Sequence, residues 1–184
     1  MDKKQLEQCI QDYGKEIYAF CASMTPNTQE AEDLYQDTFL KAVELGSRID
    51  YEQNPKSYLV SIALRIWKNR KRKYAWRNRI AGTQQLIEET AQSSEQMAEN
   101  STAGEAVNPV EEAYLDEELQ RQVREAVSKL EEKYRIPVYL YYTVQLSVAD
   151  IAAVLTIPMT TVKNRLHRAR KLLKKELEVV LDET

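Results

Sequence analysis

A helix-breaking tripeptide, Thr156-Ile157-Pro158, separates two amphipathic stretches near the end of the chain and constrains the fold more than any other feature. Ser147 marks the start of the first stretch, because its hydroxyl can cap unpaired helical N–H groups, and Asp150 three residues later strengthens this signal. Proline suits the opening of the second stretch, since its missing N–H has no partner in a first helical turn. The pattern predicts two helices joined by a tight turn.

The second of these helices combines one apolar stripe with a cationic remainder. The stripe recurs at steps of four, three and four residues: Val162, Leu166, Ala169 and Leu173. Seven Lys or Arg and no Asp or Glu lie between residues 163 and 175. A solvated charged helix would explain a basic run alone. The turn, the cap and the unopposed charge together favour a helix-turn-helix that enters a DNA major groove.

The middle of the chain is poor in large apolar residues and rich in Ala, Gln, Ser, Thr and Glu. Such a segment cannot bury enough surface to offset its conformational entropy. It also carries the acidic excess, with 11 Asp/Glu against 2 Lys/Arg between residues 82 and 126. We therefore expect an all-α fold of two small helical domains, residues 1–81 and 111–184, joined by a flexible acidic linker at residues 82–110. The second domain contains the helix-turn-helix.

Several functional classes are disfavoured by what the chain lacks. No apolar run approaches the length of a membrane span, and the polar start MDKKQLEQ has no signal-peptide character, so we expect a cytoplasmic protein without membrane insertion of its own. Cys9 and Cys21 are expected to be reduced and half-buried. His167 is the single histidine, and no metal-spaced cysteine set, nucleophile motif or phosphate-binding glycine loop is present. We expect no catalytic residues, no metal site and no cofactor.

Three helices are predicted in the first domain, at Leu6–Met24, Thr28–Leu45 and Pro55–Ile80. The second helix carries an acidic face around one leucine, formed by Asp33, Gln36, Asp37, Leu40 and Glu44. An isolated exposed leucine needs no explanation. An acidic surface with an apolar centre, however, also suits docking of a basic protein partner. The residues alone leave both interpretations open.

The second half of the third helix is cationic and aromatic. Its sequence from residue 65 to residue 79 is RIWKNRKRKYAWRNR, with eight Lys or Arg and no carboxylate. One side is lined by Arg65, Lys68, Arg72, Trp76 and Arg79. Cations that follow phosphates, interleaved with rings that stack on unpaired bases, are typical of single-stranded nucleic-acid binding. A solvated basic helix whose tryptophans pack on the core is the alternative.

Two blocks of the sequence resemble the extracytoplasmic-function (ECF) sigma factors of bacterial RNA polymerase. Residues 31–42, AEDLYQDTFLKA, are similar to the family's polymerase-binding helix, with its pattern in Asp33, Gln36, Asp37 and Phe39. Residues 130–173 resemble the family's promoter-reading domain, and IPMTTVKNRLHRARK is close to its recognition-helix sequence. Glycine is frequent in the family where this chain has Thr156 and Thr160, and asparagine where it has Arg65.

The resemblance implies a sigma factor that binds core RNA polymerase and promoter DNA, and it also implies a cognate anti-sigma protein. It assigns the acidic face of the second helix to polymerase docking. It implies a flipped-base pocket at residues 47–56 and a surface for the melted minus-ten strand at Tyr58, Arg65, Lys68, Asn69, Arg72, Tyr74, Trp76 and Arg79. It places contacts to the minus-thirty-five duplex at Thr160, Thr161, Lys163, Asn164, Arg165, His167, Arg168 and Lys171, with Arg165 and Lys171 nearer the phosphates than the base edges.

The serious alternative is a stand-alone transcriptional regulator that binds duplex DNA through the helix-turn-helix. Such proteins usually dimerise to match a two-fold site, and no sustained heptad is present here. A regulator of this kind would also have no use for a second basic, aromatic helix.

Overall fold

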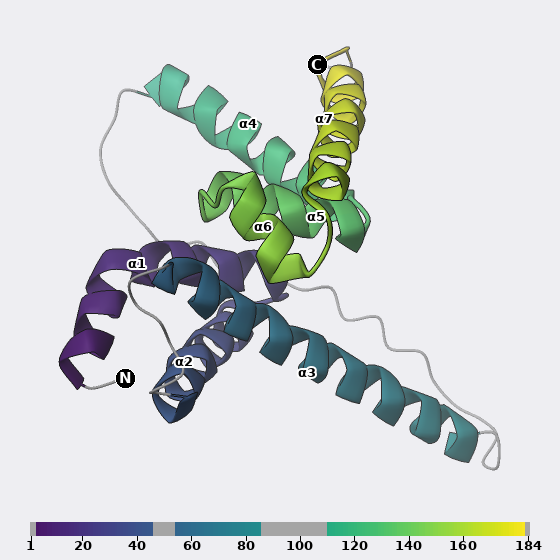
Figure 1. Ribbon diagram of the computed structural model, residues 1–184. Helices are drawn as coiled ribbons and strands as arrows, with labels where there is room; N and C mark the ends of the chain where they lie inside the picture. The colour runs from purple at the N-terminus through teal and green to yellow at the C-terminus, as the bar shows by residue number, and fades with distance from the viewer. Residues whose placement is uncertain (1–2, 46–53, 86–109, 183–184) are drawn as a thin grey trace.

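The computed structural model describes residues 3–45, 54–85 and 110–182, and these ranges form helices and turns with no strand. Figure 1 shows the helices in two groups, named here the N-terminal and C-terminal modules. The N-terminal module contains α1 (Lys3–Met24), α2 (Thr28–Leu45) and α3 (Pro55–Gln85). The C-terminal module contains α4 (Val110–Lys129), α5 (Glu132–Val138), the π-helical segment η2 (Tyr139–Thr143), α6 (Val148–Leu155) and α7 (Met159–Asp182). The predicted all-α fold is confirmed. Most of the predicted linker lies outside the described residues, so the domain boundaries stay a prediction.

Asparagine side chains cap the first turns of α2 and α3. The Asn27 Oδ1 atom accepts a hydrogen bond from the Glu30 N–H at 2.8 Å, and the Asn54 Oδ1 atom accepts one from the Ser57 N–H at 3.1 Å. Each bond satisfies an N–H group that has no partner within the helix. The predicted start and end of α2 are confirmed, whereas α3 continues past its predicted end at Ile80.

The core of the N-terminal module forms where the apolar faces of α1, α2 and α3 pack against one another. The buried side chains include Ile17, Phe20, Leu34 and Leu59. Cys9 and Cys21 are free and fully buried, so the prediction of half-buried cysteines was wrong because α1 is covered by both neighbouring helices. Burial raises the pKa of the Cys21 thiol to about 12, which keeps it protonated at physiological pH.

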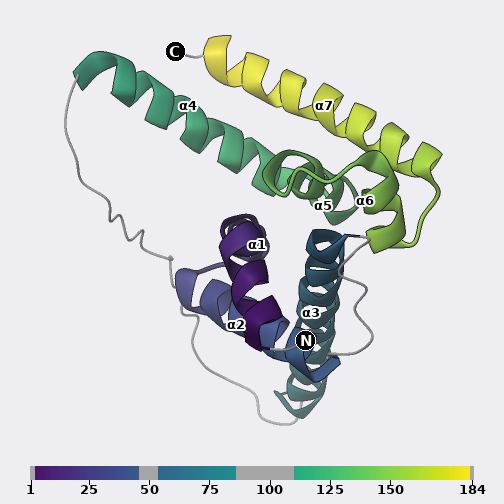
Figure 2. The same cartoon turned by 60° about the vertical axis from the view of Figure 1, so that its left-hand side comes forward.

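The two modules contact each other through α3 with α6 and through α1 with η2. Figure 2 shows α4 and α7 on the far side of this contact from α1, α2 and α3. The spacing of Leu59, Ile62, Ala63 and Ile66 predicts one buried stripe on α3, and Val60 and Leu64 are buried as well although they lie outside it. The sequence pattern underestimated the buried arc because α3 is contacted by α1, α2 and α6 rather than by one layer. No described helix is both long and apolar enough to cross a bilayer.

Candidate nucleic-acid interface

The turn of the helix-turn-helix forms as predicted and adopts a Schellman geometry. The Ser147 hydroxyl accepts the Asp150 N–H at 3.1 Å and donates to the Asp150 carboxylate at 2.6 Å, which caps α6. At the other end, the Ile157 N–H donates to the Ala152 carbonyl at 3.0 Å. Thr156 is left-handed, with φ 55° and ψ 47°, at the position where this motif favours glycine. Pro158 lies directly before α7, so the turn sets the angle of α7 against α6.

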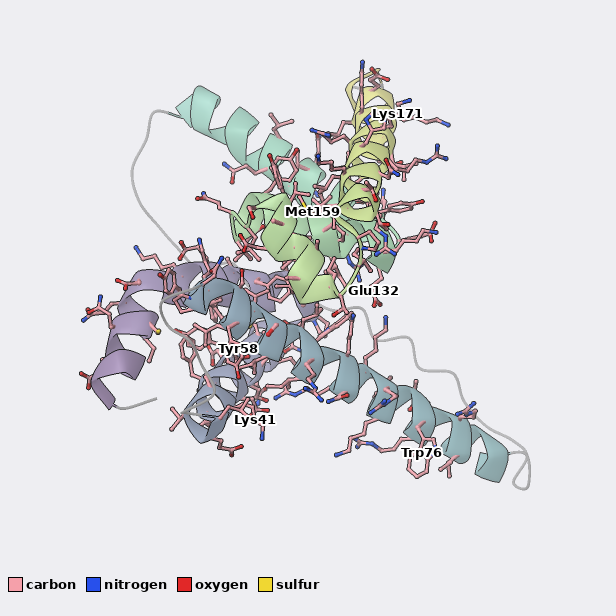
Figure 3. All side chains as sticks on the ribbon, in the orientation of Figure 1. Lys41, Tyr58, Trp76, Glu132, Met159 and Lys171 are labelled. Carbon is pink, nitrogen blue, oxygen red and sulfur yellow. The ribbon has the colours of Figure 1, made fainter. Side chains whose placement is uncertain are left out.

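The recognition helix α7 buries one stripe and exposes a cationic face. Val162, Leu166 and Ala169 are buried, which confirms the predicted seam, and Leu173 packs against it. Six of the eight predicted duplex contacts are exposed: Thr160, Lys163, Asn164, His167, Arg168 and Lys171. Thr161 and Arg165 are partly buried. Figure 3 shows Lys171 on the outer surface of α7, away from the N-terminal module.

The η2 segment supplies residues beside the recognition helix that the sequence pattern did not identify. A small hollow of about 110 Å³ is lined by Tyr141 and Tyr142 from η2 and by Lys163 and Arg170 from α7. The two tyrosine rings meet edge to face at 5.0 Å. Lys163 therefore lies on the flank of α7, at the edge of the face that carries Asn164. A π-helical turn, which often marks functional sites, leaves no pattern in the sequence.

Most of the predicted strand-binding surface lies on one side of α3. Arg65, Lys68, Asn69 and Arg72 line a hollow of about 590 Å³ whose other wall is the end of α6, from Ala153 to Thr156. Trp76 and Arg79 continue this side beyond the module contact, beside Arg72. Trp76 is 57% exposed and points into solvent from the projecting end of α3, as Figure 3 shows. Tyr58 is partly buried near the start of the helix.

The structure separates Tyr74 from the rest of the predicted strand-binding set. Tyr74 and Trp76 are two residues apart, about 200° around an α-helix, so they lie on nearly opposite sides. Tyr74 instead lines a hollow of about 680 Å³ with Trp67, Arg70, Lys71 and Arg77. The aromatic–cationic pattern did not distinguish the two sides, because the helix is basic all round.

The acidic face of α2 is exposed around Leu40, which is 63% exposed. Asp33, Gln36, Asp37 and Glu44 are exposed with it, as predicted. Two of the carboxylates have partners within the chain: Arg70 Nη2 lies 2.5 Å from Asp37 Oδ2, and Lys41 Nζ lies 2.7 Å from Glu44 Oε2. The face is consequently less acidic than the sequence suggests, and Leu40 forms its apolar centre.

Two further expectations concern the flipped-base pocket and metal binding. The predicted flipped-base pocket at residues 47–56 falls mainly on residues 46–53, which lie outside them. Among the residues that the structure describes, no group of three His, Cys, Asp or Glu side chains could hold a metal ion.

Family comparisons match both modules separately. Residues 9–77 match the model of sigma-70 region 2, and residues 120–173 match the model of sigma-70 region 4. The ECF RNA polymerase sigma factor SigW of Bacillus subtilis (strain 168) is 31% identical over 180 residues, covering 96% of this chain and 90% of the relative. The RNA polymerase sigma-H factor of Pseudomonas aeruginosa is 27% identical, covering 99% of this chain and 91% of the relative.

Solved structures share the fold. The sigma factor RpoE of Bartonella quintana, in complex with the anti-sigma factor NepR, superposes with a TM-score of 0.72 at 22% identity, covering 96% of this chain and 98% of that one. CnrH in complex with the cytosolic domain of CnrY superposes with a TM-score of 0.66 at 21% identity, covering 97% and 90% of the two chains.

Thr156 provides a test of the turn geometry. A left-handed backbone costs a residue other than glycine about 1–2 kcal/mol, so we expect Thr156→Gly to raise the free energy of unfolding of the C-terminal module by about 1 kcal/mol. Urea unfolding followed by circular dichroism measures this change. Thr160→Gly is the control, because Thr160 lies within α7 and glycine is a weaker helix former there. A stabilisation of equal size in both variants would contradict the explanation.

Proposed function

This chain belongs to the ECF sigma factors of bacterial RNA polymerase, and we propose that three of its surfaces divide the steps of promoter selection. As a sigma factor it joins core RNA polymerase and directs initiation to promoters. The observation that supports these separate functions is that two cationic surfaces lie on different modules. One is the outer face of α7, and the other is the side of α3 that carries Arg65 and Trp76.

The outer face of α7 reads the minus-thirty-five duplex. Support comes from the buried stripe of α7, which turns Asn164, His167 and Arg168 towards solvent in the first half of this helix. Residues near the start of such a helix reach base edges in the major groove. Arginine can donate two hydrogen bonds to guanine, whereas cations further along the helix reach phosphates and fix position without selecting sequence.

The side of α3 with Arg65, Lys68, Arg72 and Trp76 holds the melted minus-ten strand. Its cations lie along the helix and Trp76 exposes most of its ring, which suits phosphates and unpaired bases respectively. The cost of extruding a base is a few kcal/mol, and stacking on an aromatic ring returns about 1–3 kcal/mol per base. Strand capture on this side is therefore energetically feasible.

Simultaneous use of both DNA surfaces requires the modules to separate. The minus-thirty-five and minus-ten elements are about 25 base pairs apart, as their designations state. At 3.4 Å per base pair this distance is roughly 85 Å of duplex. In this structure α6 instead faces the same hollow as Arg65 and Lys68. The polar link between the modules that involves Lys71 and Glu132 is solvent-exposed, and such pairs contribute only about 0–1 kcal/mol.

The Leu40 face of α2 docks on core RNA polymerase. An exposed leucine within a ring of acidic and amide side chains provides apolar burial at the centre and selectivity for a basic partner at the rim. We also infer a cognate anti-sigma protein, because a solved relative of the same fold is bound to one. The site of action is the cytoplasm. The chain selects where the polymerase acts and supplies no catalytic group of its own.

Transcription with purified components tests the function directly. Run-off transcription from a genomic fragment library should yield discrete products when core polymerase is supplemented with this chain. A band-shift experiment with and without core polymerase distinguishes a sigma factor from a stand-alone transcriptional regulator. Tight, sequence-specific binding by the free chain, with no run-off product, would favour a stand-alone regulator.

Arg168→Ala should weaken promoter binding by the holoenzyme by about 1–3 kcal/mol and relax selection at one base pair, because it removes a contact to a base edge. Filter binding to a set of single-base promoter variants measures both effects. Lys171→Ala is the matched control: it should weaken binding uniformly and reduce the slope of log K against log salt by about 0.9. The same sequence profile in both variants would rule out base contact by Arg168.

Leu40→Glu should lower affinity for core polymerase at least about tenfold, because burying a leucine contributes about 1.5–3 kcal/mol. Fluorescence anisotropy of labelled chain titrated with core polymerase gives the dissociation constant. Leu119→Glu is the control, since Leu119 is a similarly exposed leucine on α4 of the other module. If Leu40→Glu binds as tightly as the unmodified chain, α2 does not dock through this face.

A further inference from the structure

A cation from α3, Arg70, lies on the surface of α2 that is proposed for polymerase docking. Its Nη2 atom is 2.5 Å from Asp37 Oδ2 and donates to the Asp33 carbonyl oxygen at 3.2 Å. Asp33 and Asp37 are four residues apart, so they lie on the same side of α2. The guanidinium group therefore spans one turn of the docking face and is held there by two acceptors.

The ion pair between Arg70 and Asp37 changes what a basic partner meets on this face. Glu44, another carboxylate of the face, pairs with Lys41 of the same helix, whereas Arg70 comes from a neighbouring helix. A basic side chain that approaches Asp37 finds its Oδ2 atom occupied and a positive charge already in place. Because like charges repel, such a partner has to displace Arg70 before it pairs fully with Asp37.

The pair between Arg70 and Asp37 is exposed enough to be displaced. The two side chains are 39% and 51% exposed. Ion pairs with this exposure are weak, because water screens both charges and the side chains lose conformational freedom when they pair. A partner that excludes water around Asp37 strengthens its own ion pair with the carboxylate. The exchange therefore favours the partner, and competition from Arg70 reduces the gain.

The structure also provides a place for the displaced guanidinium group. Arg70 and Glu30 both line the hollow of about 680 Å³ between α3 and the turn that joins α1 to α2. Within the described ranges no ion pair involves the Glu30 carboxylate, which accepts a hydrogen bond from the Asn27 amide at 3.4 Å. Glu30 lies two turns before Asp37 on the same side of α2. Arg70 can thus exchange one carboxylate for the other along α2.

We propose that Arg70 is an internal competitor of polymerase docking. It occupies Asp37 in the free chain and turns towards Glu30 when a basic side chain of the polymerase takes its place. The inference rests on the proposed function, because it requires that the Leu40 face binds core polymerase. Arg70 acts through Asp37 and is in this sense a positioning residue. Its presence lowers the affinity of the chain for polymerase.

Fluorescence anisotropy of the labelled full chain, titrated with core polymerase, measures the competition. Arg70→Gln removes the charge and retains a donor for the Asp33 carbonyl oxygen, so α2 and α3 stay linked. We expect this variant to bind about threefold more tightly than the unmodified chain, within the range for exposed ion pairs. Arg70→Lys retains the charge and should bind to within about 1.5-fold of the unmodified chain. Circular dichroism verifies that both variants are folded.

Arg77→Gln is the matched control for net charge. Arg77 lies seven residues after Arg70, two turns further along the same side of α3. None of the ion pairs in the described parts of the chain involves Arg77. Its removal should change the affinity by less than about 1.5-fold, because exposed charges at this separation are largely screened. An equal gain in Arg70→Gln and Arg77→Gln would attribute the effect to net charge and overturn competition at Asp37.

A double-mutant cycle tests whether Arg70 acts through Asp37. In an Asp37→Asn background, Arg70→Gln should change the affinity by less than about 1.5-fold, because the carboxylate that Arg70 occupies is absent. The gain from Arg70→Gln should also disappear at about 1 M salt, where the Debye length is about 3 Å. A threefold gain that persists in the Asp37→Asn background would overturn the proposal.

Leu40→Glu, measured in the same titration, distinguishes failure of this inference from failure of the proposed function. Weaker binding of Leu40→Glu together with unchanged or weaker binding of Arg70→Gln would leave docking through α2 standing and overturn competition by Arg70. If Leu40→Glu and Asp37→Asn both bind as tightly as the unmodified chain, α2 is not the docking face and the inference fails with it.

Discussion

Burial of the first half of α3 between α1 and α2 holds its second half in solvent, and the rest of the functional arrangement depends on this. Leu59 and Ala63 are buried in the three-helix core, whereas the residues after Ile66 carry too much positive charge to be buried. A continuous helix transmits the orientation of its anchored half to its free half. The cationic and aromatic side chains therefore project from a rigid helix. The conformational entropy of ordering this backbone is lost when the module folds, so it does not reduce the affinity for DNA.

Charge is distributed so that neighbouring surfaces favour different partners. The chain has a net charge of −3, yet α3 and α7 present dense positive charge while α2 presents carboxylates around Leu40. Arg70 and Asp37 connect the acidic and basic surfaces at 2.5 Å. Because short-range electrostatics decide which partner approaches each surface, an overall acidic protein can bind DNA at two places. The acidic face of α2 also disfavours DNA at the surface that we propose for polymerase docking.

The contact between the modules places the helix-turn-helix beside the proposed strand-binding side of α3. The end of α6, including the left-handed Thr156, faces Arg65 and Lys68 across one hollow. The described polar link, Lys71 with Glu132, is exposed and weak. A weak polar link of this kind yields readily to a larger partner. Promoter DNA, which under the proposed function holds the two modules far apart, is such a partner.

The sequence by itself determined the helices of the N-terminal module, the two helices of the helix-turn-helix and the buried stripe of α7, because these depend on local spacing and on residues such as Ser147 and Pro158. It also indicated the family, through motifs on α2 and α7. Only the tertiary structure decided which side of α3 each cation and ring occupies, that Tyr74 lies apart from Trp76, and that Asp37 is paired with Arg70. Periodicity along a helix that is basic all round carries no information about sides, since the distinction arises from the helices packed against it.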